Sequence, residues 1–152
     1  MIDYQPAPIF ERPWRSVTTY TLTAAQNVLN NTVSKVQVAN EISDPFNLYD
    51  GANFRINMPP WARSFEAKAY AQFTAGLGTG FFSEIRDYAS GGGSYNSFFS
   101  PAGNVITMPA FTPIYPVTTA GRYLEFYVYQ NSGSTRALFT DGRVYLSVTF
   151  YP

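Results

Sequence analysis

The sequence lacks cysteine and histidine altogether, and it has few charged residues. Without cysteine the chain can form no disulfide, thiolate nucleophile, zinc–thiolate site or iron–sulfur cluster. Without histidine it loses the commonest general base and metal ligand, so Ser–His and Cys–His catalysis cannot occur within the chain. Asp, Glu, Lys and Arg make up 13% of the 152 residues, about half of the roughly 25% that is usual. We therefore expect no enzyme activity, no cofactor and no metal site.

Charge of either sign is not in excess, since ten Lys and Arg balance ten Asp and Glu. A neutral chain without a basic run argues against nucleic acid as the main partner. No stretch of about 18 uninterrupted apolar residues exists, so no membrane-spanning helix is expected. The opening segment MIDYQPAPIFERPW has neither the basic start nor the apolar core of a secretory signal.

Aromatic side chains, by contrast, are abundant. The chain has 13 Phe, 12 Tyr and 2 Trp, and 45% of its residues are apolar, which is too many for a disordered chain. A nearly neutral surface favours self-association. The composition therefore indicates a folded protein that functions in contact with other molecules.

Residues 1–15 differ from the rest of the chain, because Pro6, Pro8 and Pro13 interrupt an apolar and aromatic segment. Proline fixes φ and removes a backbone donor, so we expect an extended arm here rather than a helix or a central strand. Such an arm would dock on another protein or subunit, or pack on its own domain. Its expected docking residues are Tyr4, Ile9, Phe10 and Trp14.

Residues 16–152 are predicted to form one all-β domain. Alternating apolar and polar residues, or β-rich composition, predict strands over 17–23, 32–38, 53–58, 65–73, 81–88, 104–108, 122–130 and 143–151. Asp50-Gly51 and Asp141-Gly142 predict tight turns in which glycine supplies a positive φ. About eight to ten short strands at this spacing indicate an antiparallel β-sandwich or barrel.

The segment 89–103 is rich in glycine and serine, and it is predicted to be a long surface loop. Its aromatic residues would be available to stack on a sugar or to contact a protein partner. The residues expected to do so are Tyr95, Phe98 and Phe99.

Two segments carry a resemblance to tumour-necrosis-factor-like jelly rolls, including the globular heads of the complement first component. In NLYDGANFRINMPPWARSFEAKAYAQF, residues Asn53, Phe54 and Pro59 match the family's pattern N-x-F-x-x-x-x-P. The second segment is TPIYPVTTAGRYLEFYVYQNSGSTRALFTDGRVYLSVTF. Its matching positions are Gly121, Leu124, Val128, Tyr129, Asn131, Gly133, Gly142, Tyr145 and Leu146. The resemblance spans roughly residues 33–151 and implies a jelly-roll β-sandwich.

The chain departs from this pattern twice. Arg122 stands where the family has an acidic residue, and Trp61, Ala62 and Arg63 replace a glycine–aromatic pair. The resemblance further implies a homotrimer with aromatic side chains around its three-fold axis. A strand face of tyrosines is too aromatic for an ordinary solvated surface. The residues expected at the trimer interface are Tyr115, Tyr123, Tyr127 and Tyr129.

Candidate chemistry is sparse. Paired carboxylates could hydrolyse glycosides, but Glu84 and Asp87 lie three apart on a predicted strand and so on opposite faces, and Asp3 with Glu11 is the other pair. Asp44, Asn47 and Asp50 could ligate calcium, although turn-forming side chains explain them better.

These observations favour a structural virion protein of a bacteriophage. We expect a trimeric capsid-decoration (cement) or head-fibre protein on the particle surface, bound to the major capsid protein or another virion protein through the N-terminal arm. One alternative is a fibre or spike tip that binds a receptor or a host-surface glycan. A small jelly-roll capsid protein is the other, but such proteins usually carry a basic inner arm, and this arm holds only Arg12 and Arg15.

Overall fold

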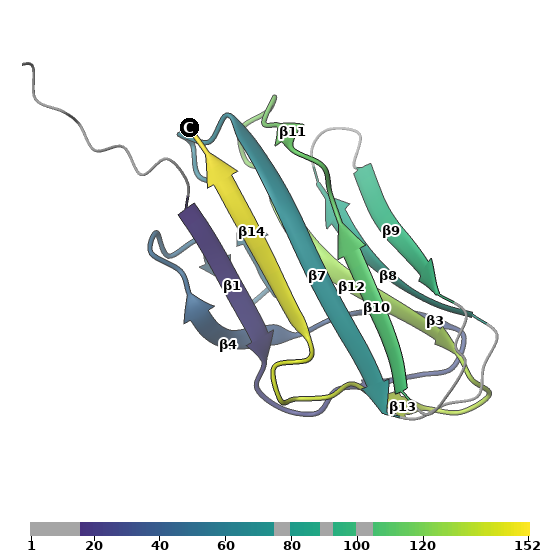
Figure 1. The fold of residues 1–152 in the computed structure, drawn as a ribbon. Coiled ribbons are helices and arrows are strands. Elements are labelled where there is room, and N and C mark those ends of the chain that lie inside the picture. The colour runs from purple at the N-terminus through teal and green to yellow at the C-terminus, as the bar shows by residue number, and fades with distance from the viewer. Residues whose placement is uncertain (1–15, 75–79, 89–92, 100–104) are drawn as a thin grey trace, which may run out of the picture.

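The computed structural model describes residues 16–74, 80–88, 93–99 and 105–152, and these residues contain strands but no helix (Figure 1). The predicted docking residues of the arm therefore lie outside the described residues. The strands are β1 (Ser16–Leu22), β2 (Asn27–Val28), β3 (Thr32–Lys35), β4 (Val38–Ser43), β5 (Tyr49–Asp50), β6 (Arg55–Asn57), β7 (Ser64–Thr74), β8 (Gly80–Asp87), β9 (Gly93–Phe99), β10 (Val105–Phe111), β11 (Tyr115–Pro116), β12 (Tyr123–Asn131), β13 (Arg136–Ala137) and β14 (Tyr145–Tyr151).

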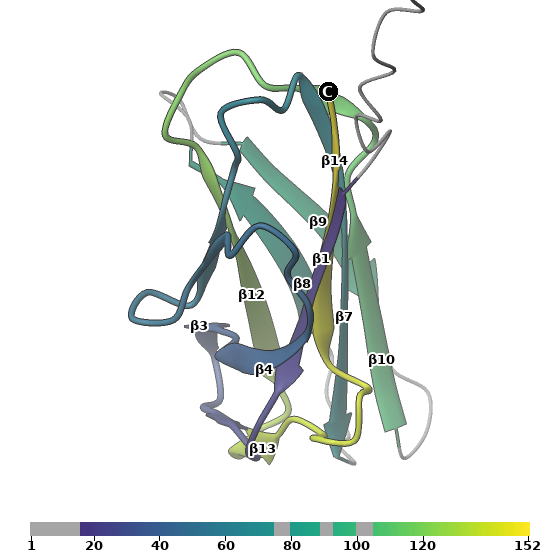
Figure 2. The ribbon, with the colours of Figure 1, turned by 90° about the vertical axis from the view of Figure 1, so that its left-hand side faces the viewer.

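Two antiparallel sheets face each other as a sandwich (Figure 2). One sheet, called the β7 sheet below, has the order β10-β7-β14-β1-β4, and β11 pairs with the start of β7. The other, the β12 sheet, has the order β5-β6-β12-β8-β9, and β3 pairs with β12. The short strands β2 and β13 pair with each other. This arrangement confirms the predicted all-β, antiparallel jelly-roll sandwich.

The core follows from strict alternation along the long strands. In β7 the buried face carries three alanines between Phe65 and Phe73, as the sequence predicts. In β14 the side chains of Leu146, Val148 and Phe150 are buried, and the residues between them are half-buried. A side-chain period of two puts every second residue between the sheets, where burial of apolar area stabilises the sandwich.

The two edge strands of the β7 sheet, β10 and β4, have different surroundings. On one side β10 lies beside β9 of the opposite sheet, which closes the sandwich there (Figure 1). On the other side β4 pairs with β1 alone, and all its residues after Val38 are exposed. Its register against β1 shifts twice, between Thr19 and Tyr20 and between Thr21 and Leu22.

The structure corrects the predicted loop over 89–103, because residues 93–99 form strand β9 and pair with residues 81–87 of β8. Glycine and serine suggested a loop, but tyrosine and phenylalanine favour strands when a partner edge is available. The strand predicted over 104–108 is present as β10, which extends from Val105 to Phe111.

The turn between β5 and β6 also differs from its prediction. Gly51 does not have a positive φ, whereas Phe54 does (φ 48°). The Asp50 carboxylate explains this, since it accepts hydrogen bonds from the Asn53 backbone N–H (3.2 Å) and side-chain amide (2.8 Å). These bonds hold a wider turn than the expected two-residue one. Gly142 has the predicted positive φ (83°).

Candidate functional site

The outer face of the β12 sheet carries three of the four tyrosines predicted for the trimer interface. Tyr123, Tyr127 and Tyr129 alternate along β12 with buried residues, and each is half-buried. Each also packs against its own sheet. The Tyr129 ring stacks on Phe82 at 5.0 Å between centroids, and the Tyr123 ring stacks on Tyr88 at 5.0 Å.

Charged side chains cover the middle of this face. The Arg86 guanidinium lies 4.0 Å from the centre of the Tyr127 ring, and it forms an ion pair with Glu84 (3.0 Å). Lys35 on β3 forms an ion pair with Glu125. Both carboxylates are nearly buried, with 7% and 5% of their residues exposed, although they point outward. These pairs satisfy each other within one chain, as buried charges require.

Tyr127 is part of the same cluster. Its hydroxyl donates a hydrogen bond to Glu125 (2.7 Å). Burial raises its pKa well above the ordinary value of 10, and the hydrogen bonds to Tyr88 and Glu125 raise it further. The phenol is therefore held neutral, in the role of a hydrogen-bond donor.

The outer face of the β7 sheet has fewer charged residues. Its strands β1, β7, β10 and β14 contain no charged residue except Glu66 and Lys68, which lie 4.0 Å apart. The edge strand β4 of the same sheet adds Glu41. The strands of the β12 sheet, in contrast, hold Lys35, Asp50, Arg55, Glu84, Arg86 and Glu125, besides the inward-facing Asp87.

Tyrosines and hydroxyls replace charges on this face. The rings of Tyr70 and Tyr145 are parallel, 5.8 Å apart, and the hydroxyls of Thr19 and Ser147 are 2.9 Å apart. Phe111 at the end of β10 leaves 66% of its surface exposed. Low charge combined with tyrosine and exposed apolar area is typical of surfaces that become buried in an assembly.

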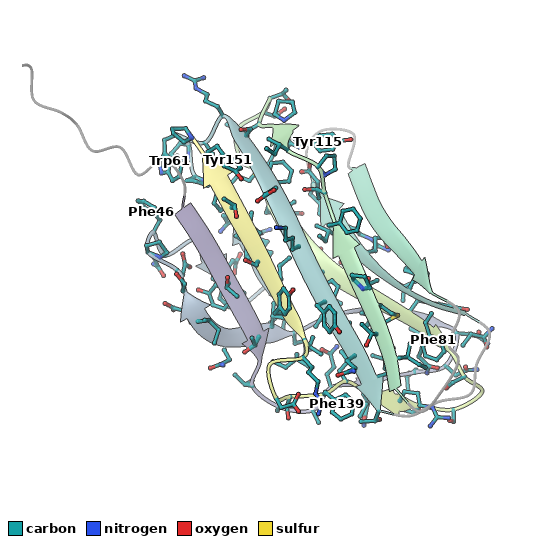
Figure 3. All side chains as sticks on the ribbon, in the orientation of Figure 1. Phe46, Trp61, Phe81, Tyr115, Phe139 and Tyr151 are labelled. Atoms are coloured by element: carbon teal, nitrogen blue, oxygen red, sulfur yellow. The ribbon has the colours of Figure 1, made fainter. Side chains whose placement is uncertain are left out.

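Tyr115 lies in β11, in the sheet opposite the other three predicted interface tyrosines. Its ring is 6.4 Å from that of Phe65, and Figure 3 shows it at one end of the sandwich. The neighbouring Ile114 is 60% exposed. The structure thus groups Tyr123, Tyr127 and Tyr129 on one face and places Tyr115 with the β7 sheet.

The aromatic residues predicted for a ligand loop are on the edge strand β9 instead. The backbones of Tyr95, Phe98 and Phe99 pair with those of Ile85, Phe82 and Phe81, respectively. Their side chains lie outside the described residues.

The turn residues considered for calcium are used within the chain. Asp44 accepts hydrogen bonds from the Tyr20 hydroxyl (2.7 Å) and the Tyr49 backbone N–H (3.0 Å). Asp50 is bound by Asn53 and by Arg55 (2.9 Å). Among the described residues, no three acidic side chains gather where they could hold a metal. The contacts therefore support the interpretation of Asp44 and Asp50 as residues that stabilise turns.

A pocket of about 350 Å³ opens at one end of the sandwich, between the loops that precede β7 and β12. Among its lining residues are Met58, Pro59, Arg63, Val117 and Thr118. None of the described residues that line it is acidic, so it offers no carboxylate pair for acid–base chemistry.

One buried ion pair was missed from the sequence. Arg122 forms two hydrogen bonds with the Asp87 carboxylate and donates a third to the Pro116 carbonyl (2.8 Å). The sequence does indicate that Asp87 faces inward, because it continues the alternation of the inward residues Phe81, Ser83 and Ile85 along β8. An inward carboxylate requires a buried cation, and Arg122 supplies it where the resemblance leads one to expect an acid.

Comparison with solved structures decides the fold. The crystal structure of murine APRIL superposes with a TM-score of 0.67 over 90% of this chain and 98% of that one. The fold is that of a tumour-necrosis-factor-like jelly roll. The structure of Eiger TNF from S. frugiperda gives a TM-score of 0.58 over 91% of this chain and 93% of that one.

Both similarities concern the fold alone, since sequence identity is 8% in each case. No protein-family model matches the chain, and no curated protein matches its sequence. None of the described segments is a helix with the length and hydropathy needed to cross a membrane.

Proposed function

We propose that this jelly roll is a non-enzymatic structural protein that assembles as a homotrimer and decorates the capsid of a bacteriophage. The observation that carries self-assembly is the contrast between its outer faces. The β12 sheet covers its face with internal ion pairs, whereas strands β1, β7, β10 and β14 of the β7 sheet present tyrosine, threonine and serine with two charges, and the edge strand β4 adds Glu41. Burying the second face removes few charges from water, so its desolvation costs less.

The proposed interface therefore includes the outer face of the β7 sheet and the apolar end formed by Phe111, Ile114 and Tyr115. Exposed apolar side chains beside a charge-poor face contribute to association through buried area, at roughly 25 cal/mol per Å². The tyrosines of β12 form the competing interface, because the sequence places them in a similar aromatic row. Substituting a charged residue into each face in turn distinguishes the two candidate interfaces.

The first measurement is the mass of the full chain by analytical ultracentrifugation. We expect three times 17.0 kDa. Thr149→Arg introduces a cation in the middle of the β7 sheet face, where Glu66 lies directly opposite and lets the fold accept it. Val33→Arg is the matched control on β3, because Val33 is 41% exposed and lies opposite Tyr129. We expect Thr149→Arg to be monomeric and Val33→Arg to stay trimeric.

Three results would count against this assignment. A monomeric wild-type chain removes the trimer. Loss of the trimer in Val33→Arg alone transfers the interface to the β12 tyrosines. A trimer that survives both substitutions excludes both faces as its centre.

Attachment to the shell is assigned to residues 1–15, whose Tyr4, Ile9 and Phe10 are large apolar side chains in a proline-rich segment. Three such arms on one trimer would bind together, and the avidity would exceed the affinity of each arm. In this proposal the protein lies on the virion surface, and its partner is the major capsid protein or another virion protein. Purified particles should contain the protein by mass spectrometry. A chain lacking residues 1–15 should remain trimeric and be absent from the particles, and full occupancy by that chain would contradict the assignment.

Binding of a host-surface glycan by a fibre or spike tip is the second candidate. The specific observation behind it is that β9 brings Tyr95, Phe98 and Phe99 to a sheet edge. Aromatic side chains there could stack on sugar rings. A glycan array with the full chain tests this, and an array without saturable binding removes the candidate.

A further inference from the structure

The pocket at one end of the sandwich lies between two loops that are tied together. One loop joins β6 to β7 and the other joins β11 to β12, so each crosses from one sheet to the other. Backbone hydrogen bonds connect the loops at both of their ends. The Met58 N–H donates to the Arg122 carbonyl (2.9 Å), and the Val117 N–H donates to the Arg63 carbonyl (2.8 Å). The pocket is therefore built into the framework of the fold.

The loop between β11 and β12 is also held by a buried side chain. Pro116 and Arg122 stand at its two ends, and the Arg122 guanidinium, paired with Asp87, donates a hydrogen bond to the Pro116 carbonyl (2.8 Å). The pocket has a volume of about 350 Å³, within the roughly 300–1,000 Å³ that is usual for small-molecule sites. A cavity held in this way needs little ordering when it binds a ligand.

The lining of the pocket combines one cation with hydroxyls and apolar surface. Met58 and Pro59 are buried and apolar, and Thr118 and Thr119 bring exposed hydroxyls. Arg63 is the only charged residue among the described residues that line it. A lining that holds a cation and no acid favours a ligand with a negative charge, and hydroxyls both donate hydrogen bonds to and accept them from a polyhydroxylated molecule.

Arg63 differs from the other lysines and arginines in the part of the chain that the structure describes. Its exposed guanidinium has no hydrogen-bond or ion-pair partner there. The others each form an ion pair with a carboxylate, except Arg136, which donates to the Ser132 hydroxyl (2.9 Å). A guanidinium presents its donors as a planar fork that matches a carboxylate. Arg63 is therefore available to a carboxylate that enters the pocket.

We infer that this pocket binds the carboxylated ring of an acidic sugar. Arg63 binds the carboxylate, the threonine hydroxyls bind the hydroxyls of the ring, and Met58 and Pro59 contact its apolar C–H groups. One cation balances the single charge of a carboxylate, whereas a phosphate monoester carries up to two. The inference goes beyond capsid attachment, and it gives the glycan-binding candidate a site that is distinct from the β9 edge.

Two-dimensional NMR of the full chain tests the inference with two acidic probes, methyl glucuronide and the methyl glycoside of sialic acid. Methyl glucoside is the matched neutral control, because it differs from methyl glucuronide only in carrying CH₂OH in place of the carboxylate. We expect saturable shifts of the Thr118 and Thr119 amide signals with at least one acidic probe. Methyl glucoside should bind about tenfold more weakly or less. Equal binding of methyl glucoside, or no saturable shift with either acidic probe, would exclude the site.

Substitution of Arg63 tests its role directly. Arg63→Gln removes the charge and keeps a polar side chain, and it should weaken binding of the acidic probe about tenfold or more, because charge-assisted hydrogen bonds are lost. Arg136→Gln is the matched control, since Arg136 lies on β13 at the opposite end of the sandwich (Figure 1) and should leave binding unchanged. Neither arginine forms an ion pair with a described residue, so both variants should fold, which thermal unfolding checks. Unchanged affinity in Arg63→Gln, or an equal loss in Arg136→Gln, would overturn the inference.

The result is separate from that of the proposed function. Particle composition tests capsid decoration, and sugar binding by the isolated chain tests the pocket. If an acidic sugar binds in a manner that depends on Arg63 while the protein is absent from virions, the pocket remains a binding site and the proposed function fails.

Discussion

Arg122 and Asp87 form a buried ion pair that joins the start of β12 to the end of β8. Their side chains are 6% and 3% exposed, and the arginine also holds the Pro116 carbonyl of β11. The pair thus connects both sheets at one end of the sandwich. A buried pair contributes little net stability compared with apolar residues, but removing one partner leaves an uncompensated charge.

Asp87→Ala should therefore lower the free energy of unfolding by about 3–5 kcal/mol. Chemical denaturation measures the loss. Asp141→Ala is the control, because Asp141 pairs with Arg143 at an exposed site where solvent screens the interaction. Similar effects of the two substitutions would show that the buried pair does not hold the end of the sandwich.

Alkaline pH should destabilise the fold through Tyr49. Burial, aided by the charge of Asp50, raises its pKa from 10.0 to about 12, and its hydroxyl donates to the Val38 carbonyl. Because the folded pKa exceeds the unfolded one, the contribution is fully present below pH 10 and is lost as pH rises from 10 through about 12. Stability of wild type and Tyr49→Phe measured from pH 8 upward checks this. The substituted chain should lose less stability above pH 10, and parallel curves would contradict the assignment.

The alanines of β7 set the spacing of the core. Ala71 is fully buried between Phe73 and Ala69, and a larger side chain there would have to displace its neighbours. Ala71→Leu should cost about 1–3 kcal/mol through overpacking. The control is Lys68→Leu on the opposite, exposed face of the same strand, which should change stability far less. Equal costs would show that the inward face has spare volume.

Gly142 precedes β14 with a φ of 83°, in the left-handed region. Gly142→Ala should lower the free energy of unfolding by about 1–2 kcal/mol, because a Cβ is disfavoured in that conformation. Gly51→Ala provides the comparison, since Gly51 is in a turn without a positive φ. Thermal unfolding ranks the two variants, and a larger cost at Gly51 would contradict the backbone argument.

The sequence predicted the parts of the fold that depend on local alternation. Leu124, Phe126 and Val128 are buried while the tyrosines between them face outward, because a period of two assigns faces without knowledge of the partner strand. The resemblance to tumour-necrosis-factor-like jelly rolls predicted the fold into which these strands assemble, and the structural comparison confirms that fold.

Strand pairing explains what the sequence could not predict. β9 is a strand because β8 offers an open edge, which the composition of residues 93–99 does not reveal. Tyr115 and Tyr127 look alike in sequence, yet they belong to different sheets. Arg122 and Asp87 are 35 residues apart, and only the pairing of β8 with β12 brings them together.

The irregular pairing of β1 with β4 has a consequence for solubility. β4 ends its sheet, and a straight outer strand would be a template for adding further copies without limit. The two register shifts at Thr19/Tyr20 and Thr21/Leu22 distort that template. An edge distorted in this way is a poorer template for strand addition, which opposes unlimited edge-to-edge growth.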